Sequence, residues 1–144
     1  MRTKADIAAE DVMGKLNCAQ STISMFAEDY GLDKTTAIRM GAGLGGGCHY
    51  GEACGVVAAG AAVVGLKYGN KEHDPETYAF CRLKTREFVE EFVARNGALT
   101  CRDLLGIDMA EPDGRDRAAA AGLFQTKCKD LVRSGVGILE EQGY

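Results

Sequence analysis

Apolar residues recur at helical spacing through most of the chain, and no stretch alternates apolar and polar residues as a strand does. Between residues 3 and 30 they return at intervals of three and four, which predicts one helix that Gly31 ends. The same pattern, with capping and breaking residues at its ends, predicts further helices over residues 33–40, 52–67, 75–96, 101–105, 113–122 and 127–141. The sequence therefore predicts an all-α fold, a single domain over residues 1–144 with about five to seven helices.

Residues with strong preferences for helix ends support these boundaries. Asp33 and Asp74 can each cap a helix, and Pro75 suits the first helical position because its missing N–H is not needed there. Thr100 stands where it can cap the short helix that Gly106 ends.

One segment is almost continuously apolar. Residues 53–66 read ACGVVAAGAAVVGL, which is shorter than the ~20 residues that a bilayer requires. Because the segment is rich in glycine and alanine, other helices can pack closely against it. We expect it to be a buried helix at the centre of the bundle.

Composition narrows the classes of partner. The 144 residues, 46% of them hydrophobic, are enough for one domain with its own core. Seventeen basic and 21 acidic residues give a net charge of −4, which does not favour nucleic acid or an anionic membrane as a partner. The N-terminal residues lack the apolar core of a secretory signal, so we expect a cytoplasmic protein without membrane insertion.

The glycine-rich stretch at residues 41–55, GAGLGGGCHYGEACG, begins with the pattern G-x-G-x-x-G of dinucleotide-binding proteins. That pattern requires a buried strand before it, a helix starting at its last glycine and an acidic residue about twenty positions later. None of these is present, and no phosphate-loop lysine follows the glycines. We interpret the glycines as positions where the backbone approaches a neighbouring helix or a site closely.

Six cysteines are the main candidates for chemistry. They stand singly, with no C-x-x-C spacing, so neither a zinc ribbon nor a thioredoxin-type motif is indicated. Structural disulfides are disfavoured in the absence of a secretory signal. Any shared site must therefore be assembled by the fold.

The position of a cysteine relative to a helix start affects its reactivity, because unpaired N–H groups there favour the thiolate. Cys54, Cys101 and Cys128 all fall near predicted helix starts, and we expect Cys54 to be the most nucleophilic. Cys18 lies off the apolar stripe of its predicted helix, so core packing does not explain it. By contrast, Cys81 is in register with the buried side of its helix and is interpreted as a core residue.

Two further residues adjoin the glycines. His49, beside Cys48, is of a type that binds metals or acts as a base, although a single loop histidine is more often a surface residue. Cys48 could either take part in a site formed by the cysteines or serve as a small residue that fills space beside the glycines.

A set of ordered motifs resembles the C_GCAxxG_C_C family of redox-active proteins, from about residue 15 to residue 141. The motifs are Asn17-Cys18-Ala19-Gln20, Gly45-Gly46-Gly47, Gly51-Glu52-Ala53-Cys54-Gly55, Gly65-Leu66-Lys67-Tyr68-Gly69, Thr100-Cys101-Arg102-Asp103-Leu104-Leu105-Gly106 and Cys128.

The resemblance implies a small helical protein that is redox-active through the four cysteines after which the family is named. These carry over to Cys18, Cys54, Cys101 and Cys128. One departure is that Val56 follows Gly55 where the family has alanine, which preserves apolar character.

Three hypotheses follow. The first is a thiol–disulfide redox protein, acting on a partner protein or small oxidant, in which the four cysteines converge and Gly45, Gly46, Gly47 and Gly55 let the backbone approach the site. In the second, the same thiolates, with Cys48 as a further candidate, bind an iron–sulfur cluster or soft metal. The third is a helical ligand-binding or interaction domain without thiol chemistry. A homodimer is compatible with the small-residue helix.

Overall fold

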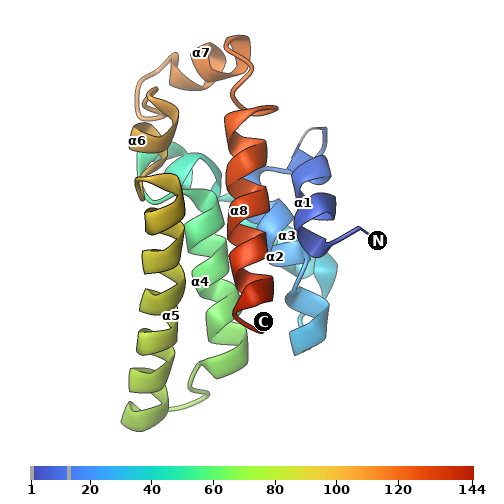
Figure 1. The fold of residues 1–144 in the computed structure, drawn as a ribbon, viewed down its shortest axis with the longest axis vertical. Helices are drawn as coiled ribbons and strands as arrows, with labels where there is room; N and C mark the ends of the chain where they lie inside the picture. The colour runs from blue at the N-terminus through green and yellow to red at the C-terminus, as the bar shows by residue number, and fades with distance from the viewer. Residues whose placement is uncertain (1, 13) are drawn as a thin grey trace.

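The computed structural model describes residues 2–12 and 14–144, and this part of the chain folds into α-helices joined by short loops (Figure 1). The helices are α1 Lys4–Val12, α2 Cys18–Ser24, α3 Lys34–Ala42, α4 Gly55–Tyr68, α5 Pro75–Asn96, α6 Cys101–Leu105, α7 Gly114–Ala120 and α8 Lys127–Glu141. A 3-10 turn, η1 Ala27–Tyr30, and a π-type turn, η2 Gly47–Gly51, complete the elements. The all-α class is confirmed, with eight α-helices in the described residues.

The N-terminal region departs from the prediction of one helix over residues 3–30. The chain instead forms α1, α2 and η1, which is why the number of helices exceeds the expected five to seven. The break comes before Asn17, whose side chain accepts a hydrogen bond from the Gln20 backbone N–H, while the Gln20 side chain accepts one from the Asn17 N–H. This capping box starts a new helix at Cys18.

The other helix ends lie close to those that the capping residues predict. Asp33, Asp74 and Thr100 each accept a hydrogen bond from a backbone N–H three residues later. Gly97 and Gly106 end their helices in the left-handed conformation. Helix α4 is the exception, because it begins at Gly55 and not near residue 52.

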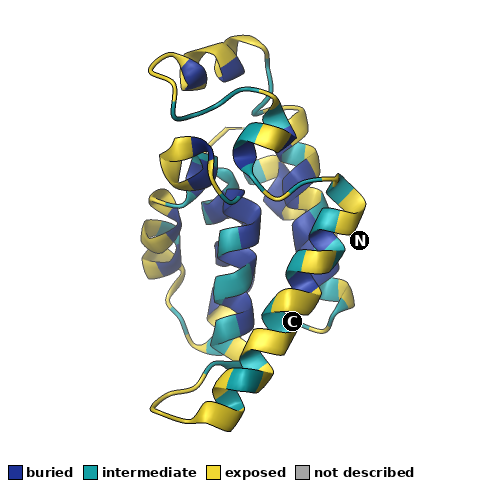
Figure 2. Cartoon of the chain, turned by 90° about the vertical axis from the view of Figure 1, so that its left-hand side faces the viewer, coloured by how far each residue is buried: buried dark blue, intermediate teal, exposed yellow. Residues whose placement is uncertain are grey.

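Helix α4 is the centre of the bundle, with α5 and α8 beside it (Figure 1) and a largely buried surface (Figure 2). Small residues permit this packing. A β-carbon on Gly60 would lie 2.3 Å from the Phe88 ring, and one on Gly135 of α8 would lie 2.1 Å from a methyl group of Val56. The small-residue segment is therefore a buried central helix, as predicted.

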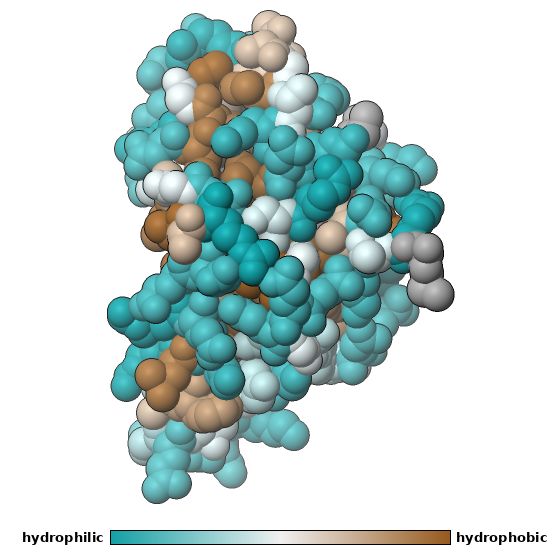
Figure 3. Space-filling view, in the orientation of Figure 1, coloured by the Kyte–Doolittle hydropathy of each residue, from teal (hydrophilic) through white to brown (hydrophobic). Residues whose placement is uncertain are grey.

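The starts of α4 and α8 and the short helix α6 lie towards the same end of the bundle, and α7 lies beyond them (Figure 1). An isolated antiparallel bridge between Ala53 and Thr100 joins the approach to α4 to the start of α6. Figure 3 shows apolar side chains on the surface near this end and over the opposite end of α5. No helix in the described residues is long and apolar enough to cross a membrane.

Candidate functional site

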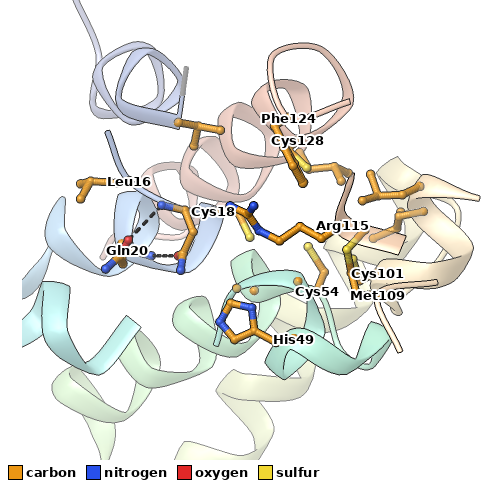
Figure 4. A pocket seen from close by; sticks show the side chains of 18 of the residues that line it. Leu16, Cys18, Gln20, His49, Cys54, Cys101, Met109, Arg115, Phe124 and Cys128 are labelled. Carbon is orange, nitrogen blue, oxygen red and sulfur yellow. Dashed lines mark hydrogen bonds between the residues drawn. The ribbon is translucent and has the colours of Figure 1, made fainter. Parts of the chain in front are cut away.

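A cavity of about 640 Å³ lies at the end of the bundle where α4 and α8 begin. Cys18, Cys54, Cys101 and Cys128 all line it (Figure 4). The fold thus brings to one cavity four cysteines that are separated by up to 110 positions in the sequence. Apolar side chains form much of the remaining wall, including those of Leu104, Phe124 and Leu131.

All four cysteines stand at the beginning of a helix. Cys18 and Cys101 are the first residues of α2 and α6, Cys54 is the N-cap of α4, and Cys128 is the second residue of α8. Sequence reasoning placed Cys18 inside a long helix, and the break before Asn17 gives it the same kind of position as the other three.

Two amide side chains hold Cys18 in place. The Asn17 Nδ2 donates to the carbonyl oxygens of Gly41 and Ala42, at 3.3 and 3.4 Å, and the Gln20 Nε2 donates to that of Ile38 at 3.1 Å. These bonds attach the start of α2 to the end of α3 while the same two residues cap α2. The sequence signal for this attachment is the N-x-x-Q capping box, which apolar spacing alone does not reveal.

The absence of a side chain at Gly55 brings Cys18 close to α4. A β-carbon there would lie 2.6 Å from the Cys18 Sγ and 3.0 Å from the Leu44 carbonyl oxygen, which is too close for a real contact. Gly55 also lines the cavity and is buried. The glycine therefore permits the approach of the thiol to the N-terminal end of α4.

The bridge between Ala53 and Thr100 fixes Cys54 relative to Cys101. The Cys54 N–H donates to the Leu99 carbonyl oxygen at 2.9 Å, and the Cys101 N–H donates to that of Glu52 at 2.7 Å. Because side chains alternate across such a pair, those of Cys54 and Cys101 extend to the same side, opposite to that of Ala53.

Cys18 has the lowest pKa of the thiols in the cavity. Its pKa falls from 9.0 to about 7. The largest cause is hydrogen bonding from the Cys54 thiol, and the backbone N–H groups of Gly46 and Ala19 lower the pKa further. Burial of the Cys18 thiol acts in the opposite direction and raises its pKa. The pKa of Cys54 rises well above 9.0 as the donor in that bond and through burial. The directions of the two shifts favour Cys18 as the first thiol of the pair to ionise, whereas the sequence analysis favoured Cys54.

Burial dominates the remaining two thiols. It raises the pKa of Cys101 to about 11 and that of Cys128 to about 12, and the nearby Cys18 thiolate adds to both increases. A position at a helix start is thus insufficient to ionise a thiol that is largely buried.

Of the four glycines that were expected to let the backbone approach the site, three line the cavity and one does not. Gly45 and Gly46 line the cavity with Gly55, and a β-carbon on Gly45 would collide with the Asn17 side chain at 2.6 Å. Gly47 is buried outside the cavity lining, where its φ of +64° and its contact with the Glu52 backbone leave no room for a side chain.

Cys48 and His49, which follow these glycines, differ in their position relative to the cavity. Cys48 is exposed outside the cavity lining, whereas His49 lines the cavity and its Nε2 donates to the Ala42 carbonyl oxygen at 2.8 Å. Both adopt the left-handed conformation, with φ values of 58° and 55°, which non-glycine residues seldom adopt. Cys81 is partly buried against the core on α5, away from the cavity lining.

The four cysteines line one cavity without forming a metal-binding group. Within residues 2–12 and 14–144, no three His, Cys, Asp or Glu side chains form a group that could hold a metal ion. Tetrahedral coordination of a metal by thiolates requires about 2.3 Å between each sulfur and the metal, and the arrangement does not fit that requirement. The arrangement therefore gives no support to the metal-binding hypothesis.

The segment between α6 and α8 contributes lining residues that sequence reasoning did not identify. They are Met109, Glu111, Pro112, Arg115 and Phe124. The segment has no repeated spacing or motif that would have connected it with the cysteines, because its place over them depends on the tertiary fold.

One comparison with known proteins bears on this site. A family model described as "Putative redox-active protein (C_GCAxxG_C_C)" matches residues 16–142. Comparison with curated proteins and with solved structures gave no match. The matched range contains all four cysteines of the cavity.

Proposed function

The chain belongs to the C_GCAxxG_C_C family of redox-active proteins, and from this premise we propose that it is a thiol–disulfide oxidoreductase in which Cys18 attacks and Cys54 resolves. The observation that carries the proposal is that the missing side chain at Gly55 lets the Cys18 thiol approach the start of α4, where Cys54 lines the same cavity. Interaction with Cys54 is the first cause that lowers the pKa of Cys18 to about 7. A thiol whose pKa is near the ambient pH attacks disulfides most effectively, because a large thiolate fraction coexists with high nucleophilicity.

The first step is attack of the Cys18 thiolate on a disulfide. A bond forms between the Cys18 Sγ and one substrate sulfur, the substrate S–S bond breaks, and the leaving thiolate takes up a proton. In the resulting mixed disulfide Cys18 no longer carries a negative charge. The charge and the hydrogen-bond acceptor that held the Cys54 pKa high are then gone.

The second step uses this change. Cys54 loses its proton more readily and attacks the Cys18 sulfur, which releases the second substrate thiol and forms the Cys18–Cys54 disulfide. Two electrons pass from the protein to the substrate, and two thiols replace one disulfide. Because burial raises their pKa values, Cys101 and Cys128 stay protonated near neutral pH and do not compete for the first attack.

A redox titration against mixtures of reduced and oxidised dithiothreitol tests the proposal, on protein purified anaerobically and assayed for metals. We expect a metal-free protein with one two-electron transition that removes two thiols. The transition should disappear in Cys18→Ser and in Cys54→Ser, and it should persist in Cys81→Ser, a matched control for a partly buried cysteine outside the cavity. Stoichiometric iron or zinc, or a transition that persists in Cys18→Ser, would overturn the proposal.

A further inference from the structure

One wall of the cavity comes from the segment that connects α6 to α8 and contains α7 (Figure 1). Met109, Pro112 and Phe124 present apolar surface there, and Arg115 provides a positive charge. In Figure 4 the Arg115 side chain projects into the cavity in whose wall the labelled cysteines lie. The wall therefore combines an apolar surface with one charged group.

The Arg115 charge has no acidic partner in the described part of the chain, although acidic residues are close in sequence. Glu111 and Asp113 both pair with Arg117. The Arg115 guanidinium instead lies over the Phe124 ring, with its central carbon 5.7 Å from the ring centroid. An arginine held in this way keeps its hydrogen-bond donors available for a ligand.

The other charged residues in the lining leave the cavity positive. Lys15 also forms no ion pair among the described residues, and Glu111 is compensated by its bond to Arg117. An anionic group entering the cavity would meet two uncompensated cations. A cationic ligand would find no free carboxylate in the lining.

The depth of the thiols limits the size of the substrate. Cys54, Cys101 and Cys128 expose only 5%, 6% and 9% of their surface, and Cys18 is half-buried. A volume of about 640 Å³ is within the range of pockets that enclose small molecules. The cavity therefore suits a small disulfide better than a disulfide on the surface of a folded protein.

From these observations we infer that the cavity binds small organic disulfides that carry a carboxylate, with the carboxylate paired to Arg115 and a disulfide sulfur at Cys18. The inference rests on the proposed thiol–disulfide function and adds the class of substrate. The reaction is balanced as two protein thiols plus one substrate disulfide giving one protein disulfide plus two substrate thiols. Arginine suits the anionic group because its planar donors form two parallel bonds to a carboxylate.

A single-turnover assay with three small disulfides tests the inference. The probes are dithiodipropionate with two carboxylates, neutral hydroxyethyl disulfide, and cystamine with two ammonium groups. The reduced protein is mixed with each, and each rate constant is divided by that of the same disulfide with 2-mercaptoethanol, which removes differences in intrinsic reactivity. The variants are Arg115→Gln and Arg82→Gln, a matched control because Arg82 lies over Tyr78 on α5, forms no ion pair in the described residues and is outside this cavity.

We expect the normalised rate to be at least about tenfold higher for dithiodipropionate than for cystamine. Arg115→Gln should remove most of this preference, whereas Arg82→Gln should leave both the preference and the rate with hydroxyethyl disulfide within about twofold of wild type. Equal normalised rates for all three probes, or an unchanged preference in Arg115→Gln, would overturn the inference while the thiol–disulfide function stands. If wild type reduces none of the probes and forms no internal disulfide, the proposed function fails as well.

Discussion

The Cys18 Sγ lies 2.6 Å from the position that a β-carbon on Gly55 would occupy. The first residue of α2 can therefore pack against the first residue of α4 only because that residue is a glycine. The thiol is thereby held next to Cys54, the N-cap of α4. The low pKa of Cys18 depends on this contact, because its first cause is the hydrogen bond from Cys54.

Gly55→Ala should therefore displace the Cys18 thiol. The added methyl group meets the Cys18 Sγ and also the Leu44 carbonyl oxygen, so we expect a loss of about 1–3 kcal/mol in the free energy of unfolding from overpacking. The Cys18 pKa should rise from about 7 towards 9.0. Urea denaturation and the pH dependence of Cys18 alkylation measure the two effects.

Gly65→Ala is the matched control on the same helix. No atom lies within 4 Å of a β-carbon placed on Gly65, so alanine should stabilise α4 by about 0.5–1 kcal/mol through its higher helix propensity. An unchanged Cys18 pKa in Gly55→Ala would show that the close contact does not control the thiol.

Replacing Cys54 separates the role of its hydrogen bond from that of its redox chemistry. Cys54→Ala removes the donor to Cys18 and should raise the Cys18 pKa, whereas Cys54→Ser retains an O–H donor and should keep it lower than in the alanine variant. Alkylation of Cys18 between pH 6 and pH 10, followed by mass spectrometry of the labelled peptide, gives both values. The same Cys18 pKa in the two variants would contradict the assigned cause.

The shifted pKa of Cys18 also makes stability depend on pH. Its folded pKa of about 7 lies below the ordinary 9.0, so the stabilising contribution is complete above pH 9 and is lost as the pH falls through 7. The difference in free energy of unfolding between the reduced wild type and Cys18→Ala should increase from pH 7 to pH 9, by on the order of 1 kcal/mol. A difference that is constant over this range, measured by urea denaturation, would show that the pKa is not lowered by folding.

Above pH 9 the sign reverses for the buried thiols. Cys101 and Cys128 have folded pKa values of about 11 and 12, so unfolded chains lose these protons first and the stability of the reduced protein should fall as the pH rises further.

Asn17→Ala tests how α2 is attached. The variant removes the N-cap and the bonds to the Gly41 and Ala42 carbonyl oxygens, so it should cost about 1 kcal/mol and slow the alkylation of Cys18 at pH 7. Asp74→Ala removes the N-cap of α5, away from the cavity, and should cost a similar amount without changing Cys18. Equal alkylation rates in the two variants would contradict a positioning role for Asn17.

Much of the fold could be predicted from the sequence because its helix ends are marked locally. Asp74, Pro75 and Gly97 define α5 through caps that act within a few residues. The break before α2 was missed because apolar spacing continues across it, although the capping residues Asn17 and Gln20 were visible in the sequence. Spacing alone cannot distinguish one helix from two that pack in the same register.

Less of the candidate site than of the fold could be predicted from local sequence signals. Helix starts identified Cys54, Cys101 and Cys128 as candidates, but the order of their pKa values depends on burial and on the thiol next to each, which only the tertiary structure determines. Arg115 has no local signal at all, because its place in the cavity depends on how the segment after α6 folds back.

The most direct test of the account is to identify the disulfide that forms when the reduced protein is treated with one equivalent of a two-electron oxidant. Remaining thiols are blocked, the protein is digested, and linked peptides are identified by mass spectrometry. We predict a single link between Cys18 and Cys54, reversible with dithiothreitol, and free thiols at Cys101 and Cys128. A dominant link between any other two cysteines, or no link at all, would contradict the central claim that Cys18 and Cys54 form the redox pair.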